Sequence, residues 1–104
     1  MNEYEVIKKF FYPLSSKKLS LNLDDDAGLL PSKNQIVVAT DSIVEGDHFQ
    51  KNEENPSLIA KKLIRANLSD MSSMGAIPFG YTLNLSIPKK LKKKKKENWI
   101  KSFT

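Results

Sequence analysis

The sequence contains no cysteine, a single histidine and a single tryptophan. The absence of cysteine excludes a disulfide framework and any metal site built from thiolates. No apolar run approaches the about 18 residues that a membrane-spanning helix needs, and residues 1–5 are polar and acidic, unlike a secretory signal peptide. We therefore expect a cytoplasmic protein without a membrane partner, whose 104 residues form at most one domain.

The positive charge of the chain is concentrated in one stretch. The formal net charge is +5, and seven lysines lie within residues 89–96, so taking these seven from +5 leaves −2 for the rest. A run of this kind is typical of a solvated surface ahead of a helix, and the alternative is contact with phosphate or RNA. No aromatic side chains alternate with the lysines to stack on bases, so we do not expect a nucleic-acid partner.

The N-terminal part is expected to form a short helix and then an extended segment. Asn2 is a suitable N-cap, and Glu5 three residues later completes a capping box, which predicts a helix over about residues 3–11. Pro13 ends this helix. Apolar and polar residues then alternate over residues 19–23, which predicts an extended segment with one apolar face.

A threonine and an aspartate directly follow an apolar run. Residues 36–38 are β-branched and uninterrupted, as in a strand covered on both faces, and Thr40 and Asp41 come at its C-terminal end. Hydroxyl and carboxylate oxygens at a strand end are candidate metal ligands or acid–base groups. The alternative is that these residues only open a solvated turn.

Three consecutive aspartates form a second acidic cluster at residues 24–26. Neighbouring carboxylates repel one another unless a cation or solvent screens them. A turn at residues 31–34 is expected to pair residues 28–30 antiparallel with residues 36–40, which brings the aspartate cluster and Asp41 into one sheet. Taken alone, the cluster is also typical of an exposed acidic turn.

A long helix is predicted over about residues 56–74, with Asn55 as its cap and Gly75 as its stop. Asp70 falls on one helical face with three apolar residues, Ile59, Leu63 and Ala66. A buried carboxylate is costly unless donors or a metal compensate its charge, so this placement favours a cation site shared with the other acidic clusters. The alternative is that the helix frays and Asp70 reaches water.

The C-terminal part predicts one more strand and the start of a helix. Over residues 79–87 apolar side chains alternate with small or polar ones, so one face is expected to enter the core. Trp99 and Phe103 then begin an amphipathic helix that the chain does not finish. We therefore expect the chain of residues 1–104 to be truncated in its last helix.

Four short motifs occur in an order and spacing that is familiar from one enzyme family. They are Asp-Asp-Ala at residues 25–27, Val-Ala-Thr-Asp at 38–41, Val-Glu-Gly-Asp-His-Phe at 44–49 and Asn-Leu-Ser-Asp at 67–70. Together they resemble the N-terminal domain of the thiamine-monophosphate kinase family, over nearly the whole chain. The motifs at 44–49 and 67–70 are the specific ones, since the wider superfamily of aminoimidazole ribonucleotide synthetase shares the acidic pattern more loosely.

The resemblance implies a particular fold and assembly. The expected fold class is α/β, with a small mixed sheet and helices on one side, similar to the N-terminal domain of the aminoimidazole ribonucleotide synthetase superfamily. Members of the family pair this domain, which implies a homodimer through the sheet. The uncharged polar face formed by Thr82, Asn84 and Ser86 is compatible with such a contact.

The resemblance also implies a reaction, in which ATP phosphorylates thiamine monophosphate to thiamine diphosphate with the help of Mg²⁺. Asp26, Thr40, Asp41 and Asp70 match metal-binding positions of the family, and His48 matches a position that contacts thiamine phosphate. Phosphoryl transfer between two anions needs positioning and charge neutralisation more than a protein nucleophile. No catalytic residue is therefore assigned.

The chain departs from the family pattern in three places. Asp24 stands where the family usually has glycine, and Ala39 where relatives often have serine. The family's Gly-Gly-Asp segment would lie beyond Thr104, so the chain is expected to hold half a site and to be inactive alone. Two other functions stay open: another ATP-using enzyme of the superfamily, and a non-enzymatic acidic module that binds divalent cations or RNA.

Overall fold

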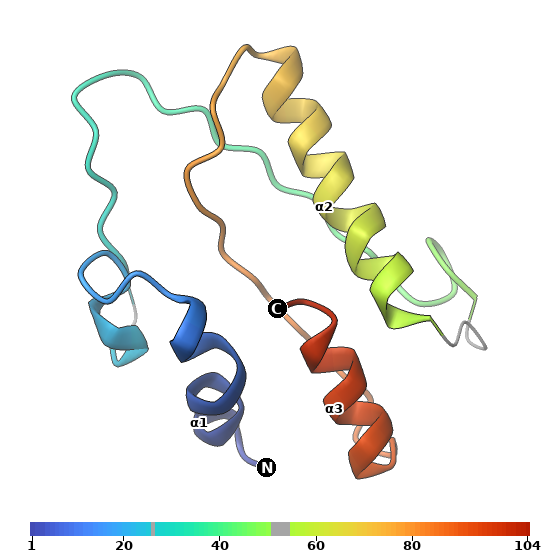
Figure 1. Cartoon of the computed structure of the whole chain (residues 1–104). Coiled ribbons are helices and arrows are strands. Elements are labelled where there is room, and N and C mark those ends of the chain that lie inside the picture. The colour runs from blue at the N-terminus through green and yellow to red at the C-terminus, as the bar shows by residue number, and fades with distance from the viewer. Residues whose placement is uncertain (26, 51–54) are drawn as a thin grey trace. The chain divides into compact units, whose positions relative to one another are not determined.

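The computed structural model describes residues 1–25, 27–50 and 55–104. It divides the chain into an N-terminal unit, Met1–Gln35 together with Thr104, and a C-terminal unit, Ile36–Phe103. Helical elements dominate the regular structure of both units (Figure 1). In chain order they are α1 (Glu3–Val6), η1 (Ile7–Phe11), η2 (Tyr12–Leu14), η3 (Leu21–Leu23), α2 (Pro56–Ser73) and α3 (Lys93–Lys101).

The predicted N-terminal helix is confirmed, together with its capping box. The Asn2 side chain accepts a hydrogen bond from the Glu5 backbone N–H at 2.9 Å, and the Glu5 carboxylate accepts one from the Asn2 N–H at 3.0 Å. Two otherwise unpaired donors are thereby satisfied. After α1 the helix continues as the π-helical turn η1 and ends in the 3₁₀ turn η2, which contains Pro13.

The extended segment predicted at residues 19–23 is wrong. Leu21–Leu23 form the 3₁₀ turn η3, with positive φ angles of 50° at Leu21, 62° at Asn22 and 55° at Leu23. The turn is closed by a 2.9 Å hydrogen bond from the Leu23 N–H to the Ser20 carbonyl. Alternation of apolar and polar residues predicts which side chains would share one face of a strand, but it does not predict that the strand is paired. Here the backbone groups find hydrogen-bond partners within a local turn instead of in a sheet.

The sheet of the predicted α/β fold is absent from the parts of the chain that the structure describes. Residues 28–30, 36–40 and 79–87 belong to no strand, and the one β-type pairing is an isolated bridge between Glu45 and Phe49. A strand is stable only where a neighbouring strand accepts and donates its backbone hydrogen bonds. Here the side chains of the predicted strands lie largely in solvent, and Val38 is 79% exposed. The prediction of a mixed sheet is therefore wrong.

The long helix predicted in the middle of the chain is confirmed almost residue for residue. α2 spans Pro56–Ser73, and the side chain of its N-cap, Asn55, accepts a hydrogen bond from the Leu58 N–H. At the other end Gly75 has a φ of +65°, in the left-handed region where glycine is favoured. The Ala76 N–H then donates to the Met71 carbonyl at 3.0 Å, which closes the end of the helix.

The core of the C-terminal unit lies where α2 meets α3. Its buried side chains are Ile59 and Ala60 from α2, and Ile100 from α3, which is only 1% exposed. Phe49 adds an aromatic contact with Trp99, at 5.7 Å between the ring centroids. The first half of α2 therefore has a covered face. Among the described helices, none is both long and apolar enough to cross a membrane.

α3 begins earlier than predicted. The lysine run was expected to precede the last helix, but Lys93–Lys101 is helical, so four of the lysines lie within its first turns. Lysine has good helix propensity, and the apolar face with Ile100 gives the segment something to pack against.

Candidate functional site

The structure describes four of the five predicted site residues, and these lie in different surroundings. Asp26 lies outside the described residues. Thr40 and Asp41 are exposed in the irregular segment that follows residue 36. His48 lies in a tight loop, and Asp70 lies in the last turns of α2.

The predicted burial of Asp70 is wrong. Asp70 is exposed, although helical phase puts it on one stripe with the buried Ile59. The reason is that α3 covers only the beginning of α2, so the later turns of the same stripe have no layer above them. The Asp70 carboxylate therefore does not need a metal to offset burial.

The shared cation site stays a prediction. Within residues 1–25, 27–50 and 55–104, no three carboxylate or imidazole groups lie close enough to hold one ion. Mg²⁺ takes many of its ligands from water and nucleotide phosphates and needs only one or two protein carboxylates. Asp41 and Asp70 offer such oxygens at the surface of the C-terminal unit.

Asp24, the residue that replaces the glycine of the family pattern, is paired within the N-terminal unit. Its carboxylate accepts a 2.8 Å hydrogen bond from the Lys8 ammonium, and this bond raises the pKa of Lys8. The same ammonium lies 4.5 Å from the centroid of the Tyr12 ring. The extra negative charge of Asp24 is thus compensated locally by Lys8, a residue that belongs to none of the four motifs.

The loop at residues 44–49, here called the His48 loop, is closed by its own backbone. The Gly46 N–H donates to the Phe49 carbonyl at 2.7 Å, and the His48 N–H donates to the Val44 carbonyl at 2.9 Å. Gly46 has a φ of +91°, which side chains disfavour. Glycine is therefore favoured at this position of the motif, because its positive φ lets the chain fold back within a few residues.

The imidazole of His48 is held by the same loop. Its Nδ1 accepts a 2.9 Å hydrogen bond from the Val44 N–H. A neutral imidazole has one donor and one acceptor nitrogen, so a ring that accepts at Nδ1 has its proton on Nε2. The loop thus presents an N–H donor at the outer edge of the ring, as contact with an anion requires.

A depression of about 440 Å³ lies beside this imidazole. It is lined by His48, Phe49, Gln50, Leu58, Ile59 and Lys62. Lys62, on α2, donates a 2.9 Å hydrogen bond from Nζ to the His48 carbonyl. A lining that combines apolar side chains with an ammonium and an imidazole suits a small molecule that combines a ring with an anionic group.

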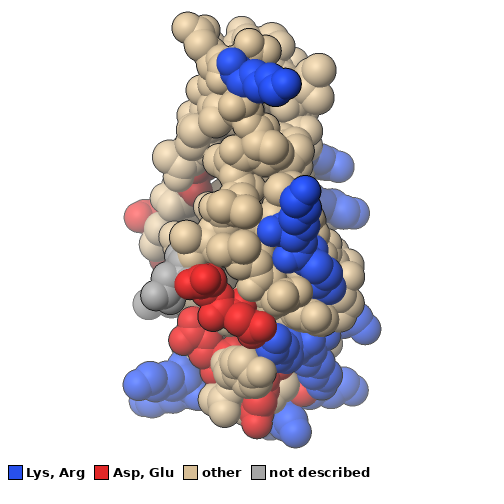
Figure 2. All heavy atoms as spheres, turned by 90° about the vertical axis from the view of Figure 1, so that its left-hand side faces the viewer, with Lys and Arg blue, Asp and Glu red and all other residues tan. Residues whose placement is uncertain are grey.

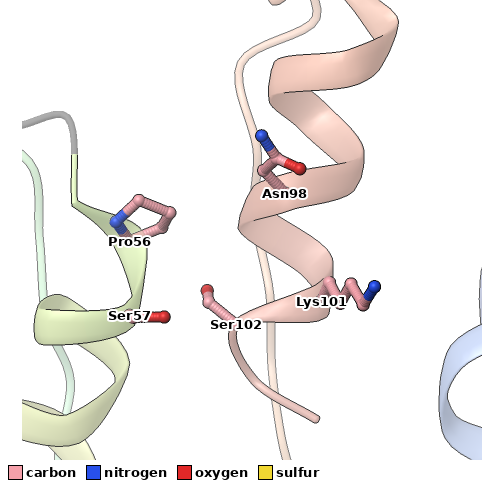
Figure 3. Close-up of a pocket in the computed structure, with 5 residues that line it drawn as sticks. All are labelled: Pro56, Ser57, Asn98, Lys101 and Ser102. Carbon is pink, nitrogen blue, oxygen red and sulfur yellow. The ribbon is translucent and has the colours of Figure 1, made fainter.

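A second depression, of about 410 Å³, lies between the start of α2 and the end of α3 (Figure 3). It is lined by Pro56, Ser57, Asn98, Lys101 and Ser102. Figure 3 shows Ser57, at the start of α2, pointing towards Ser102, the residue that follows α3. The Ser102 hydroxyl donates to the Trp99 carbonyl at 2.6 Å.

The lysine run faces solvent. Lys89, Lys90 and residues 92–95 are exposed, and Lys96 is partly covered. Figure 2 shows that lysine and arginine side chains on the face in view project outward from the surface.

Because these lysines are solvated, replacing residues 92–96 by a mixture of glutamine and serine should leave the Michaelis constant for ATP within about threefold. The measurement is steady-state kinetics in a chain of the curated relatives' length that contains these residues. An increase of about tenfold or more would show that the lysines contact the nucleotide.

Comparison with known proteins identifies the family. A family model described as "AIR synthase related protein, N-terminal domain" matches residues 24–104. The chain belongs to this family. The matched range contains the His48 loop, α2 and both exposed aspartates, but not α1. No solved structure gives a significant match.

Curated relatives of the chain are named thiamine-monophosphate kinase. The protein of Buchnera aphidicola subsp. Schizaphis graminum is 38% identical over 99% of this chain and 31% of its own length. The Escherichia coli K12 protein is 35% identical over 98% of this chain and 31% of its own length. The Synechococcus elongatus protein is 46% identical over 62% of this chain and 20% of its own length. The chain thus spans less than a third of the length of these relatives.

Sequence reasoning missed Lys62. This lysine is one of an adjacent pair in the middle of a helix and belongs to none of the four motifs. Its contact with His48 spans 14 positions, and nothing in the spacing distinguishes it from Lys61. Only a structure can show which of the two reaches the loop.

Proposed function

We propose that this chain forms the N-terminal part of a thiamine-monophosphate kinase, which transfers the γ-phosphoryl group of ATP to the phosphate of thiamine monophosphate. The observation that carries the proposal is the 38% identity to such a kinase over 99% of the chain. The His48 loop supports it, because that loop holds an imidazole N–H beside a depression lined by apolar side chains and by the ammonium of Lys62.

His48 acts as a contact for the acceptor in this proposal. The phosphate of thiamine monophosphate is already ionised at neutral pH, so it needs no protein base to become a nucleophile. The Nε2–H of His48 donates to a phosphate oxygen and holds it in place, while the apolar residues of the depression contact the ring system. Orientation of the two anions, rather than proton transfer, is what these residues supply.

Magnesium is the second part of the proposal. Asp26, Thr40, Asp41 and Asp70 would hold it, since carboxylate and hydroxyl oxygens are the ligand type that Mg²⁺ prefers. Within the described part of the chain, Asp41 and Asp70 accept no hydrogen bond from a basic side chain, so their charge is available to a cation. When bound, the metal neutralises charge on the nucleotide phosphates.

The direct test is an assay of thiamine diphosphate formation from thiamine monophosphate, ATP and Mg²⁺. It uses a chain of the relatives' length that contains these 104 residues. Formation of thiamine diphosphate that depends on both ATP and Mg²⁺ supports the proposal. Turnover of another substrate of the superfamily, with none of thiamine monophosphate, would overturn it in favour of a related enzyme.

We also propose that two copies of the protein associate, although the sheet expected to join them is absent from the described residues. The C-terminal unit leaves large apolar side chains in solvent, with Phe79 and Tyr81 each 64% exposed. Covering such residues is favourable by about 25 cal/mol per Å². Sedimentation equilibrium should therefore give a dimer mass, and a monomer mass at all concentrations would contradict this.

A further inference from the structure

Lys62 makes a contact that neither the sequence motifs nor the proposed function explains. Its ammonium lies on α2 and donates to the His48 carbonyl at 2.9 Å. The side chain is exposed, so burial does not hold it in place. Lys61, the preceding residue of α2, is also exposed and makes no such bond among the described residues. The two adjacent lysines therefore differ in one respect, contact with the His48 loop.

The bond to Lys62 ties the loop to the helix. The hydrogen bonds within the loop, Gly46 to Phe49 and His48 to Val44, close the turn through other backbone groups. They hold neither the His48 carbonyl nor the position of the turn against α2. Phe49 packs on Trp99 of α3. In the described part of the chain, the bond from Lys62 is the hydrogen bond that joins residues 44–49 to α2. Hydrogen bonds from charged donors contribute more to stability than neutral ones.

We propose that Lys62 is a positioning residue for His48. By holding the His48 carbonyl, it keeps the loop against α2 and keeps Nδ1 within reach of the Val44 N–H. The imidazole then stays in the tautomer with its proton on Nε2, beside the depression that both residues line. The ligand class for this donor is a phosphate ester with a small ring system, and only this last point rests on the proposed function.

The single histidine of the chain makes the proposal measurable without any assay of activity. In a ¹⁵N-labelled sample of the 104-residue chain, every imidazole nitrogen signal belongs to His48. At a pH of about 9, where imidazoles are neutral, the parent should show one dominant tautomer with a protonated Nε2. Lys62→Ala should give a mixture of both tautomers, because the loop is no longer fixed at the bond to Nδ1.

Two variants serve as matched controls. Lys61→Ala removes the same charge and the same number of atoms from the neighbouring position and should leave the tautomer of the parent. Lys62→Arg keeps a charged donor that can reach the same carbonyl and should restore it. If Lys62→Ala retains the tautomer of the parent, the positioning role is overturned. If Lys61→Ala disturbs the tautomer as much as Lys62→Ala, the effect is one of charge and the proposal is overturned as well.

Kinetics separate this proposal from the proposed function. In a chain of the relatives' length, Lys62→Ala should raise the Michaelis constant for thiamine monophosphate by about tenfold, as for the loss of one charged hydrogen bond, and leave that for ATP within about twofold. Equal increases for both substrates would overturn selective positioning. A parent that forms no thiamine diphosphate refutes the proposed function, while the tautomer measurement still decides the role of Lys62.

Discussion

Asp70→Asn is expected to lower the rate of thiamine diphosphate formation by at least about a hundredfold in a chain of the relatives' length. The substitution keeps the shape of the side chain and removes one negative charge from a proposed magnesium ligand. Loss of a group that fixes charge around a transferring phosphoryl group typically costs this much. The measurement is kcat at saturating ATP and Mg²⁺.

Because Asp70 is exposed, the substitution should lower activity without changing the stability of the metal-free protein. A substitution at an exposed site usually changes the free energy of unfolding by no more than about 0.5 kcal/mol. The melting temperature of the metal-free variant should therefore equal that of the parent, whereas the stabilisation that Mg²⁺ with ATP gives the parent should shrink.

Glu3→Gln is the matched control, since Glu3 is also exposed and lies in α1, outside the proposed site. It should change neither kcat nor the stabilisation by Mg²⁺ with ATP. If Asp70→Asn retains the rate of the parent and gains as much stability from the ligands, Asp70 binds no metal and the proposed ligand set is wrong.

The helices could be predicted from the sequence because their signals are local. The capping box of Asn2 and Glu5 and the Asn55 and Gly75 boundaries of α2 each depend on residues within a few positions of one another. Such signals act through hydrogen bonds that the segment itself completes. The predicted start of α3 is too late, because a run of lysines is typical of solvated surface but lysine also has good helix propensity.

The predicted strands failed because a strand depends on distant partners. Over residues 79–87 apolar side chains alternate with small or polar ones. Alternation alone does not provide a neighbouring strand that accepts and donates the backbone hydrogen bonds. In the C-terminal unit these residues lie outside any ladder, and Tyr81 is 64% exposed. The family assignment was nevertheless predicted from the motifs, since motif recognition does not require that the strands be paired.

The site was predictable by residue identity and not by geometry. The sequence pointed to His48, and the structure adds the bond from Val44 that selects its tautomer and the bond from Lys62 that ties its loop to α2. Helical phase put Asp70 on the stripe of Ile59, but phase cannot tell how far a neighbouring helix extends along that stripe. Whether a residue on a helix is buried depends on the element that packs against that helix as well as on the position of the residue around the helix axis.

Ile100→Ala is expected to lower the free energy of unfolding by about 2–3 kcal/mol. Ile100 is 1% exposed and lies on α3, which is in contact with α2, where Ile59 and Ala60 are the buried residues. Removing buried methyl groups costs the transfer free energy of those groups together with that of the cavity they leave. The value lies in the lower part of the usual range because exposed neighbours can collapse around the gap.

Ile77→Ala makes the same chemical change at a site that is 91% exposed, so it should alter the free energy of unfolding by no more than about 0.5 kcal/mol. Denaturant unfolding of parent and both variants, followed by the fluorescence of Trp99, measures the difference, since Trp99 is the one tryptophan of the chain and adjoins Ile100. The α2–α3 core explains the stability of this unit only if the two variants differ. Equal losses from both substitutions would mean that Ile77 is covered in solution as fully as Ile100, for instance by a second copy of the chain.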